Sequence, residues 1–267
     1  MAIYYIMKPW YKKGGGYVLD PVLNNNSWEA IQWAAQNGVA SSTWSVGDRK
    51  AVTLNGTVGV KTFSNQTVYA YILGFNHNAS VEGNNTIHFQ FGFDALTGGN
   101  HIVFIDSSYG NTGSSPAFKM NTSRRTNSGG WQYSYMRNTI IPAFISAMPS
   151  DLQSALKTVT KYTDNARTSK HDTSSYVTST QDKVFVLAEC EIWGGRWYAN
   201  QYEQNSQAQY DYYRNGGSKV TFDEKAYWYR SPYYDNGMQF CGSTYDGRAY
   251  HWDAYTSFGF APAFVVG

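Results

Sequence analysis

The sequence predicts an α+β fold, built from short twisted antiparallel strands, about three helices and long loops. Short runs rich in β-branched and aromatic residues predict the strands, and apolar residues spaced three or four positions apart predict the helices. Long segments rich in Gly, Asn, Ser and Thr, at 97–130 and 168–180, follow neither pattern and predict loops. The 267 residues are enough for one large domain or two small ones.

Residues 1–26 are expected to form an attachment or linker segment ahead of a binding domain at 27–267. Ala2–Met7 is a short apolar run with β propensity, and it is followed by two lysines and by the glycines 14–16, which form a possible hinge. Such a segment could add a strand to a neighbouring subunit, although an expression remnant or a flexible tail fits the same residues. It lacks the features of a secretory signal, so no signal peptide is expected.

Helical spacing marks three segments of the remaining chain. The first spans Ser27–Asn37 and is followed by a glycine that ends it. The second lies within 135–148, where Pro142 must either begin the helix or kink it. The third begins at Ser150, because Ser150 and Gln153 occupy the positions of a capping box.

Strands are predicted where apolar runs lie between Gly and Asn turns, at Val52–Leu54, Val58–Phe63 and Val68–Phe75. Ile87–Phe93 alternates Ile and Phe with His, Gln and Gly, which predicts a half-buried strand. Lys183–Ile192 is the strongest strand pattern of the chain. Pro262, in a last predicted strand, is expected at a sheet edge or a bulge because proline cannot donate to the ladder.

The composition favours a binding protein. Only 15% of the residues are charged, whereas 17% are aromatic, with 23 Tyr and 9 Trp. Tyr and Trp combine a large contact area with few rotors, which is why binding surfaces favour them. The net charge of +2 comes from scattered basic residues, so nucleic-acid binding is not expected. The sequence has no apolar run of about 18 residues, so membrane insertion is not expected either.

The motifs do not indicate an enzyme. The sequence contains no G-x-S-x-G elbow, no H-E-x-x-H pair and no P-loop. On the predicted strand 183–192, Glu189 and Glu191 would share a face, and we expect one of them to brace Arg230 or Arg137 by a charge-assisted hydrogen bond. A pair of opposed carboxylates in a deep cleft, as in a glycosidase, is the alternative. No cofactor is expected.

The two cysteines do not form a disulfide framework. Cys190 and Cys241 lie far apart in the sequence and neither has a C-x-x-C partner. They could pair, be free, or pack as small apolar groups, and burial of Cys190 within the predicted strand 183–192 is the preferred interpretation.

Several motifs in a fixed order resemble a family of unknown function found in gut bacteria and their phages, over roughly residues 27–267. They are SVGD at 45–48, GFNHN at 74–78, NSGGW at 127–131, Met136–Arg137, the helix at 148–161, the strand at 184–192 with Gly194, WYRSP at 228–232, Gly242, Gly247 and FGFAPAF at 258–264. The C-terminal third is similar to the C-type-lectin fold in its formylglycine-generating-enzyme-like version, which reads W-x-R-S and later G-x-x-P-A-F. In that fold Trp228 and Phe264 would be core anchors.

The resemblance implies a phage virion protein at the tail tip or another surface that mediates attachment to the host. Some proteins of this fold are diversified by retroelements at positions rich in Tyr, Asn, Asp, Ser and His. The candidate ligand-binding residues with this palette are Tyr233, Tyr234, Asp235, Asn236, Gln239, Tyr245, Arg248, Tyr250, His251, Trp252, Asp253 and Tyr255. An earlier patch at 198–213 contains five further tyrosines.

The expected partners are a host cell-surface glycan or protein and, through residues 1–26, other virion proteins. By analogy the protein would be a homo-oligomer that acts outside the cell. A structural virion component, such as a capsid decoration or baseplate protein, is the alternative.

The known chemistries of the resembled folds are not expected. The calcium-binding tripeptides of C-type lectins are missing, and Trp252–Ala254 is the nearest approach to one of them, so no metal is expected. The reactive cysteine pair that generates formylglycine is also absent, because Cys190 and Cys241 are widely separated.

Overall fold

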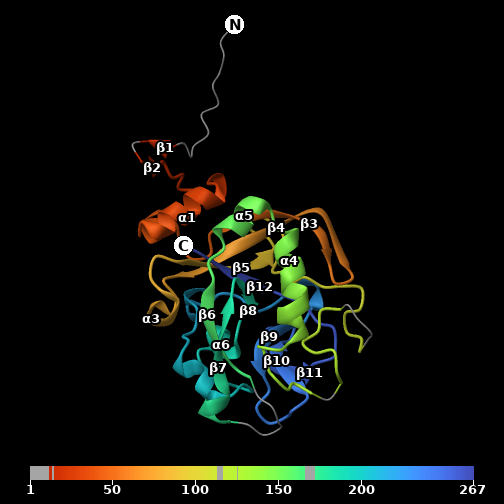
Figure 1. Ribbon diagram of the computed structural model, residues 1–267. Helices are drawn as coiled ribbons and strands as arrows, with labels where there is room; N and C mark the ends of the chain where they lie inside the picture. Colours follow the sequence, from red (N-terminus) through yellow and green to blue (C-terminus); the bar gives the residue numbers. More distant parts are fainter. Residues whose placement is uncertain (1–11, 14, 113–116, 125, 166–171) are drawn as a thin grey trace.

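A five-stranded antiparallel sheet runs through the middle of the molecule in the order β3-β4-β5-β12-β8 (Figure 1). Its strands are β3 (Arg49–Val58), β4 (Lys61–Phe75), β5 (Ile87–Phe93), β12 (Pro262–Val266) and β8 (Val184–Val186). The structure is a computed structural model that describes residues 12–13, 15–112, 117–124, 126–165 and 172–267. Together with its helices, the sheet confirms the predicted α+β class.

Two of the predicted strands are longer than expected. The segments predicted at 52–54, 58–63 and 68–75 join into the single hairpin of β3 and β4, whose turn contains Gly59 at φ +60°. The register shifts between Leu54 and Gly56, and an ideal Cβ on Gly56 would lie 3.5 Å from the Ala147 side chain of helix α4 (Ile141–Ala147). The bulge therefore lets the sheet and this helix approach closely.

Aromatic side chains cover one face of this sheet. Trp28, on helix α1 (Trp28–Gln36), packs with its ring centroid 5.4 Å from that of Phe89 and 5.7 Å from that of Phe264. Phe144 of α4 lies 5.3 Å from Phe91 on the same face. Phe264 is fully buried here, as predicted. Helix α5 (Ser150–Ala155) lies beside α1 above this face (Figure 1).

The opposite face of the sheet is polar but equally buried. The hydroxyls of Tyr71 and Tyr213 donate to Gln90 Oε1 at 2.7 and 2.6 Å. His88 Nδ1 lies 3.1 Å from the Tyr210 hydroxyl. All residues of β5 are therefore buried, and the prediction of a half-buried strand was wrong because buried hydrogen-bond partners satisfy its polar residues.

The predicted helices exist, but there are more of them. Ser27 Oγ accepts a hydrogen bond from Ala30 N and caps α1, as expected. Pro142 begins α4 directly after a π-helical turn at Met136–Ile140. The four additional short helices in the described residues are α2 (Ala40–Thr43), α3 (Ala79–Glu82), α6 (Glu189–Trp193) and α7 (Asp211–Arg214). The described helices total seven, not about three, because single turns of three to five residues carry no periodic signal.

The expected capping box at the start of α5 is absent. Pro149 occupies the N-cap position, where no side chain makes a cap hydrogen bond, and Ser150 is already the first helical residue. Gln153 instead donates through Nε2 to Met148 O at 2.8 Å. Proline fixes the extended backbone that precedes the helix, so Pro149 takes the N-cap position and Ser150 lies inside the helix instead of capping it.

The prediction of a strand over 183–192 was wrong beyond Val186. The chain leaves β8 and enters α6 at Glu189, and Gly194 at φ +75° ends this helix. Glu191 Oε2 accepts a hydrogen bond from Ala188 N at 2.9 Å, which satisfies a free amide of the first turn. Cys190 is therefore buried in a helix, and Glu189 and Glu191 do not share a strand face.

Pro262 lies neither at a sheet edge nor at a bulge. It is the first residue of β12, which lies inside the sheet between β5 and the edge strand β8. Its pairing with Val186 opens the ladder, so the missing amide falls where the strand begins, and the edge prediction was wrong.

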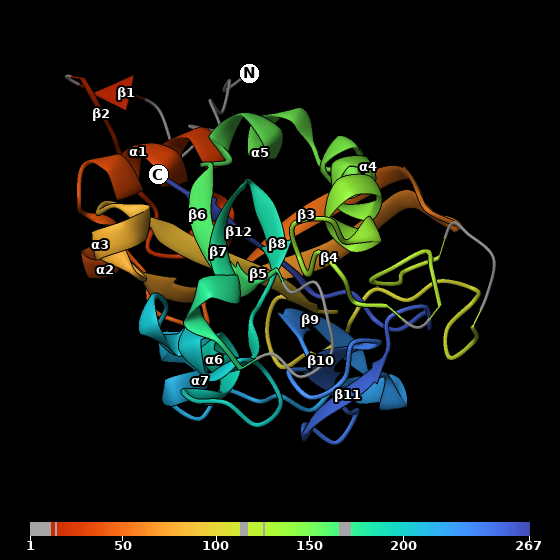
Figure 2. The ribbon, with the colours of Figure 1, turned by 60° about the horizontal axis from the view of Figure 1, so that its bottom comes forward.

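A smaller three-stranded sheet lies at the end of the molecule opposite α1 (Figures 1 and 2). Its strands are β9 (Tyr227–Pro232), β10 (Gln239–Ser243) and β11 (Ala249–Asp253), with β11 at one edge. Trp228, in β9, is buried as predicted.

β6 (Val159–Asp164) and β7 (Val177–Asp182) form a separate antiparallel pair. β7 begins inside the segment predicted as a loop at 168–180, of which residues 168–171 lie outside the described residues. The 97–130 segment is irregular wherever it is described, as expected. Short 3₁₀ turns complete the elements at Leu23–Asn25, Ser174–Tyr176, Gln201–Asn205 and Phe222–Glu224.

The described part of the lead-in segment contacts the domain. β1 (Lys12–Lys13) pairs with β2 (Gly16–Tyr17), and the Tyr17 ring lies 5.8 Å from that of Trp33. Leu23 and Asn26 are buried. Residues 1–11 and 14, which include the predicted apolar run and part of the glycine hinge, lie outside the described residues. In the described residues no helix is long and apolar enough to cross a membrane.

Candidate functional site

Three rings, one just after β9 and two on β11, form a stacked group, which we call the aromatic column: Tyr233, His251 and Tyr250. The His251 ring lies 4.1 Å from that of Tyr233 at an interplanar angle of 17°, and 5.0 Å from that of Tyr250 at 3°. Tyr198 meets His251 edge-on at 4.7 Å and 72°. The sheet carries these residues at the end of the molecule shown in Figure 2, with Tyr250 and His251 on the edge strand β11.

The column has a buried side and an exposed side. Trp252, next to Tyr250 at 5.1 Å, packs 4.7 Å from Phe258 and 6.0 Å from Trp228, and so fixes β11 to the core. Tyr250 itself is 45% exposed. A ring that is fixed on one side and open on the other suits stacking against a ligand, because little entropy is lost on binding.

The loop after α6 adds aromatic surface beside the column. The Arg196 guanidinium lies 4.3 Å from the Tyr234 ring centroid and pairs with Asp172 at 2.6 Å. Trp197, the next residue, is 63% exposed, and its ring lies 6.1 Å from that of Trp193. The sequence prediction missed Arg196 and Trp197, because they lie about 35 residues before the predicted face and only the tertiary fold brings them there.

A single buried carboxylate holds this loop. Glu189 Oε2 accepts hydrogen bonds from the backbone amides of residues 197, 198 and 199 at 2.7, 2.8 and 2.8 Å. Burial raises the pKa of Glu189, and the three amide hydrogen bonds oppose that rise. The start of α6 thus fixes the backbone that carries Trp197 and Tyr198.

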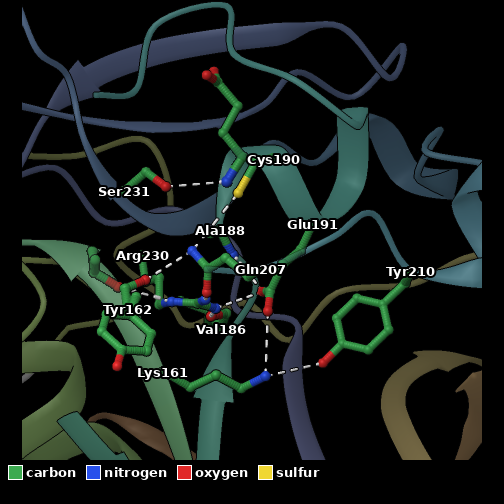
Figure 3. A network of polar contacts seen from close by, with 12 residues as sticks. Lys161, Tyr162, Val186, Ala188, Cys190, Glu191, Gln207, Tyr210, Arg230 and Ser231 are labelled. Carbon is green, nitrogen blue, oxygen red and sulfur yellow. Dashed lines mark hydrogen bonds and ion pairs between the residues drawn. The ribbon is translucent and has the colours of Figure 1, made fainter. Parts of the chain in front are cut away.

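Beneath α6 lies a network of buried charges (Figure 3). Arg230 Nη1 donates to Glu191 Oε2 at 2.6 Å, and Lys161 Nζ lies 3.2 Å from Glu191 Oε1. Lys161 Nζ also lies 2.8 Å from Glu82 Oε1. The side chains of these four residues are at most 1% exposed, so the network holds two cations and two anions away from water.

The predicted bracing of an arginine by one of the two glutamates is confirmed for Arg230 and Glu191. Burial alone would raise the pKa of Glu191, but the charges of Arg230 and Lys161 outweigh burial and hold that pKa well below its usual range. Arg137, the other candidate, instead pairs with Asp182 at 2.6 Å. The ion pairs fix α6 to β9 and β6, because Glu191, Arg230 and Lys161 come from these three elements.

A further buried carboxyl, that of Glu203, contacts Ser231, the residue after Arg230. Glu203 Oε2 accepts from the Ser231 hydroxyl at 2.5 Å, and its Oε1 accepts from Asp164 N at 2.8 Å. Ser231 Oγ in turn accepts from Glu189 N at 3.0 Å. Burial raises the pKa of Glu203 to about 8, so this carboxyl is protonated at neutral pH. Ser231 therefore links the Glu203 carboxyl to the backbone amide of Glu189, at the start of α6.

Not all predicted ligand-binding residues reach the column. Asp235 is exposed in the β9–β10 turn, whereas Asn236 Oδ1 accepts from Met238 N at 2.9 Å and shapes that turn. Gln239 pairs with Asp253 at the end of the β10–β11 ladder, and Asp253 Oδ1 accepts from Tyr255 N at 2.9 Å. These residues border the column at the end of the ladder near Tyr233, whose amide donates to Gln239 O.

Three more predicted residues lie apart from the column. Tyr245 and Arg248 occupy the hairpin tip at the opposite end of the β10–β11 ladder, where Arg248 Nε pairs with Asp246 at 3.0 Å. Tyr255 lies beyond β11, with Lys119 Nζ 4.2 Å from its ring centroid. The column and this hairpin tip are thus two separate surfaces. The sequence could not separate them, because composition does not show which tyrosines stack.

The earlier tyrosine patch at 198–213 is mostly core. Tyr210 and Tyr213 are buried beneath the central sheet, and Tyr212 packs on Tyr71 at 4.6 Å. Only Tyr198 joins the column.

The described residues give little support for cysteine chemistry, metal binding or a ligand pocket at the predicted residues. Cys190 and Cys241 are both free and buried, which settles the question of their pairing. The structure places no three His, Cys, Asp or Glu side chains of these residues in a group that could hold a metal ion. A hollow of about 440 Å³ is lined by residues 21–23, 47–49 and 96–98, and none of the predicted ligand-binding residues lines it.

The fold and the column together define an α+β protein with an aromatic face fixed from below by buried charges. A scan of protein families matches residues 102–267 to the family described as Domain of unknown function (DUF6273), and the chain belongs to that family. The matched segment contains the column, Lys161, Glu191 and Arg230, whereas Glu82 and β3 to β5 precede it. Searches of the curated proteins and of the solved structures found no match.

Proposed function

We propose that the protein is a non-enzymatic binding module of C-type-lectin-like fold, a receptor-binding protein of a phage tail tip or virion surface that attaches to a host cell-surface ligand. The single observation that carries the proposal is the aromatic column, which ends in the exposed ring of Tyr250 while its other rings are held in place. Rigid, half-exposed aromatic rings are typical of surfaces where binding energy concentrates.

The positions of the WYRSP and FAPAF segments support the lectin-like part of the proposal. Trp228–Pro232 falls within β9, and Pro262–Phe264 falls at the start of β12, so both are strands as the resemblance implies. Of the residues that the resemblance assigns to ligand binding, Tyr233–Asn236 follow β9 directly and Tyr250–Asp253 lie on β11.

Glu82 and Glu191 are not available as the two carboxyl groups of a glycosidase. Glu82 and Glu191, which share Lys161 as a partner, are both buried and ion-paired. A glycosidase needs two carboxyl groups that reach a bound sugar in an open cleft. Within the described residues these two glutamates cannot reach a substrate without opening the core.

The arrangement of the molecule suits attachment at one end and recognition at the other. The lead-in segment enters beside α1, and the small sheet lies at the opposite end (Figure 1). We propose that residues 1–26 attach the protein to other virion proteins as a homo-oligomer, since several copies raise the effective affinity of a weak site.

The test is binding of labelled full-length protein to whole bacterial cells, comparing wild type with Tyr250→Ala. We expect saturable binding by wild type that falls at least about tenfold in the variant, which corresponds to about 1.4 kcal/mol. Tyr133→Ala is the matched control, because Tyr133 is also an exposed tyrosine and is not part of the column. Circular dichroism checks that each variant is folded.

Pretreating the cells with protease or glycosidase then tells a protein ligand from a glycan. Absence of binding to every host tested, with the protein multimerised, would overturn the adhesin proposal in favour of a structural virion component.

A further inference from the structure

Lys161, the centre of the buried charge network, has the surroundings of a reacting amine. Its Nζ lies 2.8 Å from Glu82 Oε1, 3.2 Å from Glu191 Oε1 and 3.2 Å from the Tyr210 hydroxyl. The Phe185 ring centroid lies 4.1 Å away and helps to exclude water. The side chains of Lys161 and Glu82 are 0% and 1% exposed.

The carboxyl group of Glu82 is only partly satisfied. Oε1 accepts hydrogen bonds from Lys161 Nζ and from Asn78 Nδ2, the latter at 3.2 Å. Oε2 is buried and has no hydrogen-bond partner in the described residues, and the neutral His88 ring lies with Nδ1 4.0 Å from it. A buried carboxylate with one unsatisfied oxygen is costly as an ion, because both oxygens need partners once water is removed.

We propose that Lys161 and Glu82 condense into an intramolecular isopeptide bond, so that the folded protein carries a covalent cross-link between α3 and β6. The two residues are 79 positions apart in sequence, and the cross-link would close that loop. The inference is independent of the proposed function, because it concerns the core and not the binding face.

The reaction balances with the groups present. Glu82 Oε1, 2.8 Å from Nζ, accepts a proton from the Lys161 ammonium, which leaves a neutral amine and a neutral carboxyl group. The electron pair of Nζ then forms a bond to Cδ of Glu82. A second proton passes from Nζ to Oε1, the Cδ–Oε1 bond breaks, and one water molecule leaves. Nζ keeps the third proton, and Oε2 becomes the oxygen of the amide. Asn78 Nδ2, 3.2 Å from Oε1, stabilises the negative charge that gathers on this oxygen as the bond breaks.

Both protons reach the leaving oxygen directly, because Nζ lies 2.8 Å from Oε1. Glu191 stays ionised, since Arg230 Nη1 donates to its Oε2 at 2.6 Å, and its Oε1 stabilises the positive charge on Nζ from 3.2 Å. The Tyr210 hydroxyl, 3.2 Å from Nζ, helps to hold the amine in place.

The buried charges remain balanced after condensation. Before the reaction the network holds Lys161 and Arg230 against Glu82 and Glu191. The reaction removes one cation and one anion together and leaves the Arg230–Glu191 pair intact. It thereby removes the desolvation cost of two buried ions, which favours condensation in the folded protein.

The test is mass spectrometry of the denatured full-length protein and of its protease digest. We expect a whole-chain mass lower than the sequence predicts by one water, and a branched peptide that joins Glu82 to Lys161. Trypsin should cleave after Lys157 but not after Lys161, so Lys157 provides an internal control in the same digest. The digest does not depend on processing of the N-terminus.

A linear peptide that ends at Lys161, as the sole form in the wild-type digest, would overturn the inference. Lys161→Arg and Glu82→Ala should both restore the full sequence mass, whereas Lys157→Arg should keep the loss of water. If a core variant does not fold, the wild-type digest alone decides between a cross-link and an ordinary ion pair.

Discussion

Individual buried residues hold the candidate binding face in place. Glu191 faces Arg230 and Lys161, while Glu189 holds three backbone amides of the loop beside the column. The pairing of Arg230 with Glu189 or Glu191 could be predicted. A buried arginine requires a carboxylate, and both glutamates lie in the apolar segment 183–192, which was expected to be buried. Glu82 could not, since it reaches the network only through the turn between β4 and β5.

Replacing Arg230 with Met should destabilise the protein strongly. The change removes one partner of a buried pair and leaves Glu191 without its shortest hydrogen bond, which costs about 3–5 kcal/mol. Urea unfolding at constant pH measures the loss. Arg248→Met is the control, because the Arg248–Asp246 pair is exposed and worth less than about 1 kcal/mol. Equal losses for both variants would contradict a special role of the buried pair.

Glu203 should make stability depend on pH. Its pKa is raised by burial from the ordinary 4.5 to about 8, so the folded protein binds one more proton than the unfolded chain between these values. The stabilisation is full below pH 4.5 and is lost as the pH rises through this window to about 8.

The Glu203→Gln variant isolates this effect from the other carboxyls. We expect the unfolding free energy of the variant to fall less than that of wild type as pH rises toward 8, because the amide has no proton to lose. The comparison uses urea unfolding of both proteins at several pH values. Parallel pH profiles would show that Glu203 ionises normally.

At the scale of elements, long periodic segments could be predicted and short ones could not. The spans of α1 and β5 follow from spacing alone, since each has seven or more residues with a clear pattern. The change from β8 to α6 within one apolar run could not, because strand and helix look alike over so few residues and the helix depends on Glu191 and Gly194. For the same reason the loop at 194–200, which follows α6, was not included in the predicted binding site.

Replacing Glu189 with Ala should loosen that loop. The amides of Trp197, Tyr198 and Ala199 lose their common acceptor, so their hydrogen exchange should accelerate by at least about tenfold, which corresponds to about 1.4 kcal/mol of protection. NMR-detected exchange measures this directly. Glu224→Ala, at an exposed glutamate, is the control and should leave these amides unchanged.

The stability of the whole molecule depends on contacts between the N-terminal segment that carries β3 to β5 and the C-terminal segment that carries β8 and β12. β12 lies between β5 and β8, and its Phe264 ring stacks 5.2 Å from Phe89. The sequence indicated a last strand with Phe264 in the core, but not its neighbours, because the pairing of segments about 170 residues apart leaves no local signal. The tyrosines of the column were named for the same site by composition, and only the fold shows which of them stack.

The family segment alone should not fold. A fragment of residues 102–267 lacks β5 and Trp28, so one edge of β12 and one face of Phe264 would be exposed to water. We expect its near-ultraviolet circular dichroism to lack the signals of packed aromatic rings. Adding the complementary fragment 1–101 should restore them, and a fragment that is native by itself would contradict this dependence.

The position of β12 between β5 and β8 also determines when the sheet can form during synthesis. Both strands that flank it, β5 and β8, are translated before it, so each presents an unpaired edge until residues 262–266 leave the ribosome. Open edges of this kind pair readily with other chains, and the nascent protein carries both of them from the completion of β8 at Val186 until β12 emerges. The sheet can close only as a late event, and the interval before closure is when this protein is most exposed to aggregation.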